Sequence, residues 1–221
     1  MNLLRLRGFP LFEHINESEL HGVLTCLGAR HAVYDKGSFI SLSGDTLRCI
    51  GVIETGCVHM IKEDLWGGKS ILMVLRQGEL FGESFICSQT FAANVSFQAA
   101  ADSTILFLPF NRVLRSCSKT CTFHQRMIEN MVTLIALKNI RFIEKLDISS
   151  KKSIREKLLT FLSQEAQAAG TTTITLALGR VDLAAYLGVD RSALTRELAR
   201  MKGEGLLDYQ KNTYTLYALD K

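Results

Sequence analysis

The chain has 221 residues, 47% of them hydrophobic, and its 26 Lys and Arg against 22 Asp and Glu give a formal net charge of +4. This length suggests one large or two modest domains with a well-buried core. The near balance of charge excludes a histone-like polycation, so nucleic-acid binding must come from local placement of charge. The sequence has no apolar run long enough to span a bilayer and no signal-peptide core at its start. We therefore expect a cytoplasmic protein with no membrane partner.

The six cysteines are scattered and form no CxxC pair; they stand at positions 26, 49, 57, 87, 117 and 121. We expect reduced thiols. Cys117 and Cys121 would share one helix face, where they could form half a zinc site or a redox pair, although buried small hydrophobes are the simpler interpretation. Cys57 and His59 alternate on a predicted strand, which alone is weak evidence for a metal. We expect no metal site and no cofactor.

A short N-terminal helix is predicted over residues 17–27. From about Arg30 to Leu108, short apolar runs alternate with glycine turns, a pattern typical of a β-sandwich or barrel. The predicted strands in this region are Cys49–Ile53, Val58–Ile61, Ser70–Leu75 and Ser103–Leu108.

A long helical stretch follows over residues 110–146, broken near residues 116–122. It nearly holds an apolar heptad stripe made of Ile128, Met131, Ile135, Lys138, Phe142 and Ile143. Such a stripe favours a dimeric coiled coil, and packing onto the β domain is the alternative. The polar segment Asp147–Lys152 is the expected hinge.

Two helices joined by a tight turn are predicted near the C-terminus, after a helix over residues 153–164 and a strand-like segment over residues 171–178. The first helix runs from about Val181 to Leu187. Gly188 permits the positive φ of a turn, and Asp190 is a good N-cap for the second helix. Residues 208–211 and 213–219 then form a hairpin around Asn212. This spacing is that of a winged helix-turn-helix.

The second helix has two different faces. Leu194, Leu198 and Met201 recur as one buried stripe, and the opposite face carries Arg191, Ser192, Thr195, Arg196 and Arg200. An α-helix fits the DNA major groove, where Arg pairs with guanine. We expect Arg191, Ser192 and Arg196 to read base edges. Arg180 and Thr195 are expected to contact phosphates, with Gly179 as the N-cap of the first helix.

The glycine-marked motifs of the β region are similar to those of a known family. They are Asp35-Lys36-Gly37-Ser38-Phe39-Ile40 with Ser43-Gly44-Asp45, Ile53-Glu54-Thr55-Gly56-Cys57-Val58, and Leu75-Arg76-Gln77-Gly78-Glu79-Leu80-Phe81-Gly82-Glu83. With the long helix and Gly188-Val189-Asp190-Arg191, the whole chain resembles the Crp/Fnr family of bacterial transcription regulators. The resemblance implies a homodimer that binds palindromic DNA and responds to a ligand or redox signal.

The chain departs from the cyclic-AMP branch of that family at the ligand site. That branch has an Arg-Ser pair where this chain has Ala93 and Asn94, although Glu83 is present. No Lys or Arg occurs between Arg76 and Arg112, and burying a phosphate without a cation is costly. We therefore expect no binding of cyclic AMP. The iron-sulfur branch holds its cluster with several N-terminal cysteines, and it is disfavoured because only Cys26 precedes Cys49 in this chain. The haem-binding branch is also disfavoured. It has a Cys and a His just after the corresponding turn, where this chain has Glu83, Ser84 and Phe85.

By resemblance, Lys138 and Asn139 of the long helix face the effector pocket. Lys138 is either a cation for an anionic effector or a snorkelling residue at a coiled-coil seam.

The expected fold is α+β: an N-terminal double-stranded β-roll, a long dimerisation helix over about residues 122–146, and a C-terminal winged helix-turn-helix. The domains are residues 1–147, for sensing, and 148–221, for DNA binding. The expected function is a sequence-specific DNA-binding regulator without catalysis. Its partners are a palindromic duplex operator, a second copy of the chain, RNA polymerase and a small-molecule effector. The alternative is a cyclic-nucleotide-binding module that regulates a partner protein.

Overall fold

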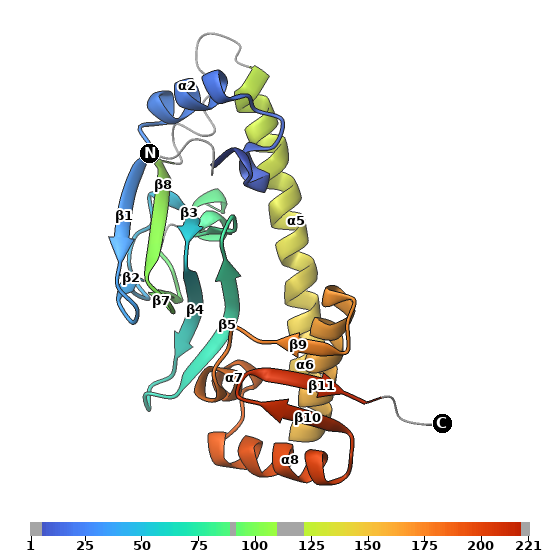
Figure 1. Ribbon diagram of the computed structural model, residues 1–221. Coiled ribbons are helices and arrows are strands. Elements are labelled where there is room, and N and C mark those ends of the chain that lie inside the picture. The colour runs from blue at the N-terminus through green and yellow to red at the C-terminus, as the bar shows by residue number, and fades with distance from the viewer. Residues whose placement is uncertain (1–5, 89–91, 110–121, 218–221) are drawn as a thin grey trace. The chain divides into compact units, whose positions relative to one another are not determined.

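The computed structural model describes residues 6–88, 92–109 and 122–217 (Figure 1). It divides into two compact units: an N-terminal unit of Met1–Trp66 and Met73–Asn139, and a C-terminal unit of Gly67–Leu72 and Ile140–Lys221. The predicted division into residues 1–147 and 148–221 stays a prediction about function. No helix of the described residues is long and apolar enough to cross a membrane.

The strands between residues 30 and 109 form two four-stranded sheets whose recorded strand pairs are antiparallel. One sheet has the order β1 (Arg30–Tyr34), β8 (Ser103–Pro109), β3 (Cys49–Thr55), β6 (Leu80–Phe81). The other has the order β2 (Phe39–Ser41), β7 (Ser96–Ala99), β4 (Cys57–Glu63), β5 (Lys69–Arg76). The sheets pack through Phe81 and Phe97, whose ring centroids are 4.9 Å apart. The predicted strands therefore lie within β3, β4, β5 and β8, as a sandwich-like roll requires.

Two glycines of the roll are fixed by close approach of other groups. A Cβ on Gly51 in β3 would lie 2.2 Å from the ring of Phe81. Gly56, between β3 and β4, has φ +88, and a Cβ there would lie 2.5 Å from the backbone oxygen of Asp102. Neither position accepts a side chain without a shift of its neighbours, so both glycines are structural requirements of the roll.

The tip of the β4–β5 hairpin is exposed and apolar. Leu65 is 96% exposed and Trp66 is 90% exposed. Large apolar side chains at this level of exposure make no contribution to the core.

The N-terminal helices cover one end of the roll. Helix α2 (Glu17–Leu27) begins with a capping box between Asn16 and Glu19 and ends at Gly28 in the left-handed conformation, so both helix ends are satisfied. Its bounds equal the predicted ones. Its apolar face joins one core cluster with the 3-10 helix η1 (Pro10–Phe12) and the first turns of α5 (Thr122–Ser150), including Met127 and Met131. Arg126 and Asn130 of α5 also donate hydrogen bonds to carbonyls of residues 11–14.

Helix α5 continues to Ser150, so the predicted hinge over Asp147–Lys152 is wrong in most of its length. Polar residues do not by themselves break a helix. Here Lys151 forms an ion pair with Asp147 at 2.7 Å, and the Ser150 hydroxyl donates to the Asp147 carbonyl. Ile148 in the same turn is buried. The helix-free residues are Lys151, Lys152 and Ser153. The predicted helical residues 110–121 lie outside the described residues.

The C-terminal unit packs three helices with a small sheet. They are α6 (Ile154–Ala169), α7 (Arg180–Leu187) and α8 (Arg191–Gly203), with the sheet order β10 (Leu207–Gln210), β11 (Thr213–Leu216), β9 (Thr173–Thr175). Helix α6 begins with a capping box between Ser153 and Glu156. The β10–β11 hairpin confirms the predicted wing, with Lys211 at its turn in the left-handed conformation.

Candidate nucleic-acid interface and effector pocket

The turn between α7 and α8 has the predicted geometry. Gly188 has φ +63 and donates its amide hydrogen to the Ala184 carbonyl. Asp190 is the N-cap of α8, where its Oδ1 accepts from the Ser192 hydroxyl at 2.5 Å and from the Ala193 amide at 2.8 Å. These two bonds hold the pKa of Asp190 below its usual value, and the bond from Ser192 contributes most.

Helix α8 separates its residues as the sequence predicts. Leu194, Leu198 and Met201 are buried, and the opposite face exposes Arg191, Ser192, Thr195, Arg196 and Arg200. Among the described residues, the guanidinium groups of Arg191 and Arg196 have no hydrogen bond or ion pair. Both are therefore available to donate to base edges or phosphates.

The hydroxyls on this face are partly engaged. Ser192 donates to Asp190, and Thr195 donates to the Arg191 carbonyl at 2.9 Å. Each hydroxyl has thus committed its hydrogen and offers acceptor lone pairs to an incoming group. Arg200 is paired with Glu204 at 3.0 Å, so the basic groups available for reading bases are Arg191 and Arg196.

An ion-pair network fixes α8 to α6. Arg155 of α6 bonds Glu197 at 2.6 Å and Glu204 at 2.7 Å, and the bond from Arg155 lowers the pKa of Glu204. Sequence reasoning missed this network because its members are distant in the chain.

Arg180, the predicted phosphate contact, packs against the wing. Its guanidinium carbon lies 4.8 Å from the Tyr209 ring centroid and 5.8 Å from that of Tyr214. Its Nη1 is buried and has no partner among the described residues. Gly179 is the N-cap of α7, as expected, and contributes no side-chain bond. The stacking on the tyrosines links α7 to the wing and holds the guanidinium at the start of α7.

Two lysines donate to carbonyls at the C-terminal end of α7, where the helix dipole favours cations. Lys145 bonds the Tyr186 carbonyl, and its Nζ also lies 3.5 Å from the centroid of the Tyr186 ring. Lys157 donates to the Leu187 carbonyl at 3.4 Å. Burial and the nearby charge of Lys157 lower the pKa of Lys145 to about 8. The sequence gives no sign of this arrangement, because Lys145 stands in a polar helical stretch.

In the N-terminal unit, the structure brings together two of the five predicted pocket residues. Glu83 begins the short helix α3 (Glu83–Cys87) and is 2% exposed. Lys138 Nζ lies 2.6 Å from Glu83 Oε1 and 2.7 Å from the Leu80 carbonyl oxygen. Neither of the two predicted roles of Lys138 included this contact, which joins α5 to the roll.

The other three predicted pocket residues do not join this pair. Ala93 is buried and exchanges backbone hydrogen bonds with Gly44 and Asp45. Asn94 and Asn139 are exposed.

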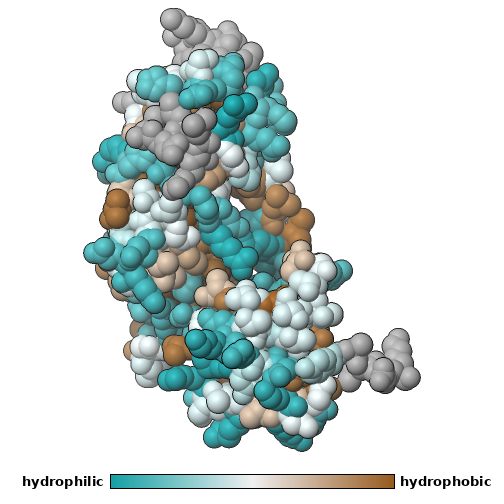
Figure 2. Space-filling model, in the orientation of Figure 1, coloured by the Kyte–Doolittle hydropathy of each residue, from teal (hydrophilic) through white to brown (hydrophobic). Residues whose placement is uncertain are grey.

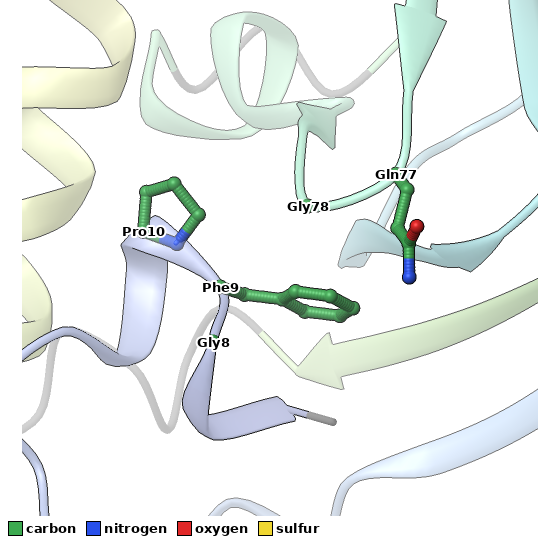
Figure 3. Close-up of a pocket in the computed structure, with 5 residues that line it drawn as sticks. All are labelled: Gly8, Phe9, Pro10, Gln77 and Gly78. Carbon is green, nitrogen blue, oxygen red and sulfur yellow. The ribbon is translucent and has the colours of Figure 1, made fainter. Parts of the chain in front are cut away.

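A separate surface pocket of about 310 Å³ lies between the N-terminal segment and the β5–β6 turn (Figure 3). Gly8, Phe9, Pro10, Gln77 and Gly78 line it, and the ring of Phe9 extends toward Gln77. This lining has no ionisable side chain and includes none of the predicted effector-pocket residues.

Metal-binding clusters are absent from the part of the chain that the structure describes. Cys57 and His59 both lie on β4, as expected. Cys117 and Cys121 lie outside the described residues.

Comparison with known families matches both parts of the chain. A cyclic nucleotide-binding domain model matches residues 31–120, and a Crp-like helix-turn-helix domain model matches residues 156–221.

Two relatives have related sequences. The regulatory protein HlyX of Actinobacillus pleuropneumoniae is 28% identical over 219 residues, which cover 96% of this chain and 86% of HlyX. Electron transport regulator A of Shewanella oneidensis is 27% identical over 179 residues, 78% of this chain and 69% of that protein.

Two solved structures share the fold. The c-di-GMP-responsive global regulator CLP of Xanthomonas campestris has a TM-score of 0.73 at 16% identity, covering 90% of this chain and 100% of CLP. A CooA mutant from Carboxydothermus hydrogenoformans has a TM-score of 0.70 at 20% identity, covering 99% and 93%. With a cyclic nucleotide-binding-type roll followed by a Crp-like helix-turn-helix, the chain belongs to the Crp/Fnr family of DNA-binding transcription regulators.

Proposed function

We propose that the protein binds a palindromic operator as a homodimer, with α8 of each protomer in the major groove of one half-site. The observation that carries this proposal is the exposed face of α8, where the guanidinium groups of Arg191 and Arg196 make no hydrogen bond or ion pair among the described residues. Arg donates two parallel hydrogen bonds to O6 and N7 of guanine, so two such residues can specify bases. Ser192 and Thr195 add polar contacts on the same face, and Arg180 stands at the start of α7 for a phosphate.

A stripe of exposed residues on α5 supports the homodimer. Val132, Ala136, Asn139, Ile143 and Leu146 are all exposed and recur at alternating spacings of four and three, as in a coiled-coil seam. Val132, Ile143 and Leu146 are 59%, 65% and 68% exposed. Figure 2 shows hydrophobic side chains at the surface along the middle of α5. A polar Asn in such a seam sets the register of the two helices, which gives Asn139 a role other than the predicted pocket contact.

The proposal extends to the partners that the family comparison leaves open. RNA polymerase is a further partner, and the protein acts in the cytoplasm. A small ligand or a redox signal received by the N-terminal unit modulates DNA binding and is not required for it. No catalytic step is needed for this function.

Footprinting tests the proposal on an operator selected from a random duplex library. We expect two protected half-sites centred about 34 Å apart, one helical turn, because the two recognition helices are related by a two-fold axis. Binding should weaken steeply with salt, because phosphate contacts release counterions. A single asymmetric half-site would contradict the homodimer.

A further inference from the structure

The buried carboxylate of Glu83 and the ammonium of Lys138 form a closed pair inside the N-terminal unit. We propose that Lys138 is a built-in ligand: its ammonium fills a cation site formed by Glu83 and the Leu80 carbonyl, and the protein thereby binds DNA without an added ligand at that site.

The geometry is that of a cation site. Two acceptors from different elements, Leu80 of β6 and Glu83 of α3, converge on one ammonium from α5 at 2.7 and 2.6 Å. Glu83 is 2% exposed and Lys138 is 14% exposed, so water screens the pair weakly. The second carboxylate oxygen, Glu83 Oε2, is also buried and has no partner among the described residues. A buried carboxylate in this state depends on its one cation, because an unpaired buried charge is strongly destabilising.

This arrangement fixes which chemistry the site accepts. The positive charge of Lys138 is already paired with the Glu83 carboxylate, so an incoming anion would meet no free cation. The site therefore excludes phosphates. If Lys138 were truncated, the vacated site would match a primary alkylammonium, which carries both the positive charge and the N–H donors that the two oxygens require.

The pair also explains how α5 is held without an effector. Lys138 is the penultimate residue of the N-terminal unit, whose range ends at Asn139. Its two bonds therefore tie α5 to α3 and β6 at the point where the chain passes into the C-terminal unit. The inference rests on the proposed function for its DNA-binding readout, whereas the site itself can be tested without DNA.

Amine rescue tests the site directly. In Lys138→Ala, the melting temperature should fall by on the order of 10 °C, because Glu83 loses its buried partner. Added n-butylammonium should restore at least half of that loss, and tetramethylammonium, which has no N–H, should restore none. Lys151→Ala is the matched control, because it removes the half-exposed partner of Asp147 just beyond the end of the same helix. Its melting temperature should change little and should not respond to the amine. A loss in Lys138→Ala no larger than in Lys151→Ala would overturn the inference.

A charge-pair cycle covers the case in which Lys138→Ala does not fold. The Glu83→Gln, Lys138→Met double variant should melt well above Lys138→Met alone, because it carries no unpaired buried charge. Equal melting temperatures would contradict the inference.

The DNA arm compares the natively purified chain with the chain refolded from denaturant, from which any small ligand has been removed. We expect equal affinity for the selected operator within about twofold. Binding that returns only after a small-molecule extract is added would overturn the inference. Failure of both preparations to bind DNA, together with successful amine rescue, would instead contradict the proposed function.

Discussion

Met131 and Val132 are neighbours on α5 and lie in different environments: Met131 is 4% exposed within the N-terminal core, and Val132 is 59% exposed. The helix therefore has two apolar stripes. Of the predicted stripe, Met131, Ile135 and Lys138 pack onto the protomer's own roll, which was the alternative interpretation, whereas Ile143 at its end is 65% exposed. The stripe through Val132 and Ile143 is exposed, and under the proposed function it is the seam with a second copy.

Replacing Ile143 by Glu should dissociate the homodimer. In a parallel symmetric seam each residue faces its symmetry mate, so the change places two carboxylates together at a cost of several kcal/mol. We expect the dimer dissociation constant to rise by about 100-fold or more in sedimentation equilibrium. Val33→Glu is the control, because Val33 is 74% exposed on β1, outside the stripe. An Ile143→Glu protein that remains dimeric at the concentrations of the parent chain would count against this seam.

Arg196→Ala should cost about 1–3 kcal/mol of specific DNA binding, the typical value of a bidentate Arg–guanine contact. Competition binding against operator and unrelated duplexes measures the effect as a fall in the specific-to-nonspecific ratio. Arg48→Ala, which removes an exposed Arg from the N-terminal unit, controls for the change in net charge. An unchanged ratio in Arg196→Ala would remove this residue from base reading.

Arg180→Ala should weaken binding to all sequences to a similar extent, because a phosphate contact carries no sequence information. The slope of binding against salt concentration should also become shallower by about one unit. Since Arg180 stacks on Tyr209, circular dichroism should first confirm that the C-terminal unit is intact. A sequence-dependent loss would show that Arg180 reads bases.

Lys145 should make stability rise with pH above about 8. Its pKa is lowered to about 8 in the folded chain from 10.5. Between these values the unfolded chain holds more protons, so the free energy of unfolding increases with pH, by up to about 3 kcal/mol. Below pH 8 the cost of the buried charge is complete. The contacts of Lys145 with Tyr186 favour the charged ammonium and therefore reduce this increase in the free energy of unfolding. Denaturant unfolding of the parent and Lys145→Met at pH 7.5 and 9.5 measures the difference, and parallel pH dependences in the two proteins would disprove the assignment.

Cyclic AMP and cyclic GMP should not bind with micromolar affinity in calorimetric titrations. Ala93 and Asn94 supply no cation for the phosphate, and Lys138 is held by Glu83 at 2.6 Å. Micromolar binding of either nucleotide would contradict this reading of the pocket, and Lys138→Ala would then show whether that residue moves to the phosphate.

The helix-turn-helix could be predicted because its determinants are local. A glycine at the turn, an Asp cap and a stripe at helical spacing each act within a few residues of the chain, and the structure has all three at Gly188, Asp190 and Leu194–Met201. The same holds for α2, whose cap and left-handed Gly28 set its ends.

The parts of the fold and of the candidate site that the sequence did not predict depend on contacts between residues distant in the chain. A heptad pattern cannot tell which of two apolar stripes packs inside the protomer, because Met131 and Val132 are equally apolar. The pairing of Lys138 with Glu83 joins residues 55 positions apart, and the Arg155 network spans a similar distance. The predicted hinge failed because the last turn of α5 is stabilised by the buried side chain of Ile148 and by the ion pair from Asp147 to Lys151, just beyond the helix end.

The exposed tip of the β4–β5 hairpin determines what intrinsic fluorescence can report. Trp66 is the one tryptophan in the sequence and is 90% exposed in the folded chain. An indole already surrounded by water emits at nearly the same wavelength when the chain unfolds, so its emission is a poor measure of denaturation. Quenching of Trp66 fluorescence by iodide instead reports whether another molecule binds over the hairpin tip. Such contacts can therefore be detected in the native chain without an added fluorophore.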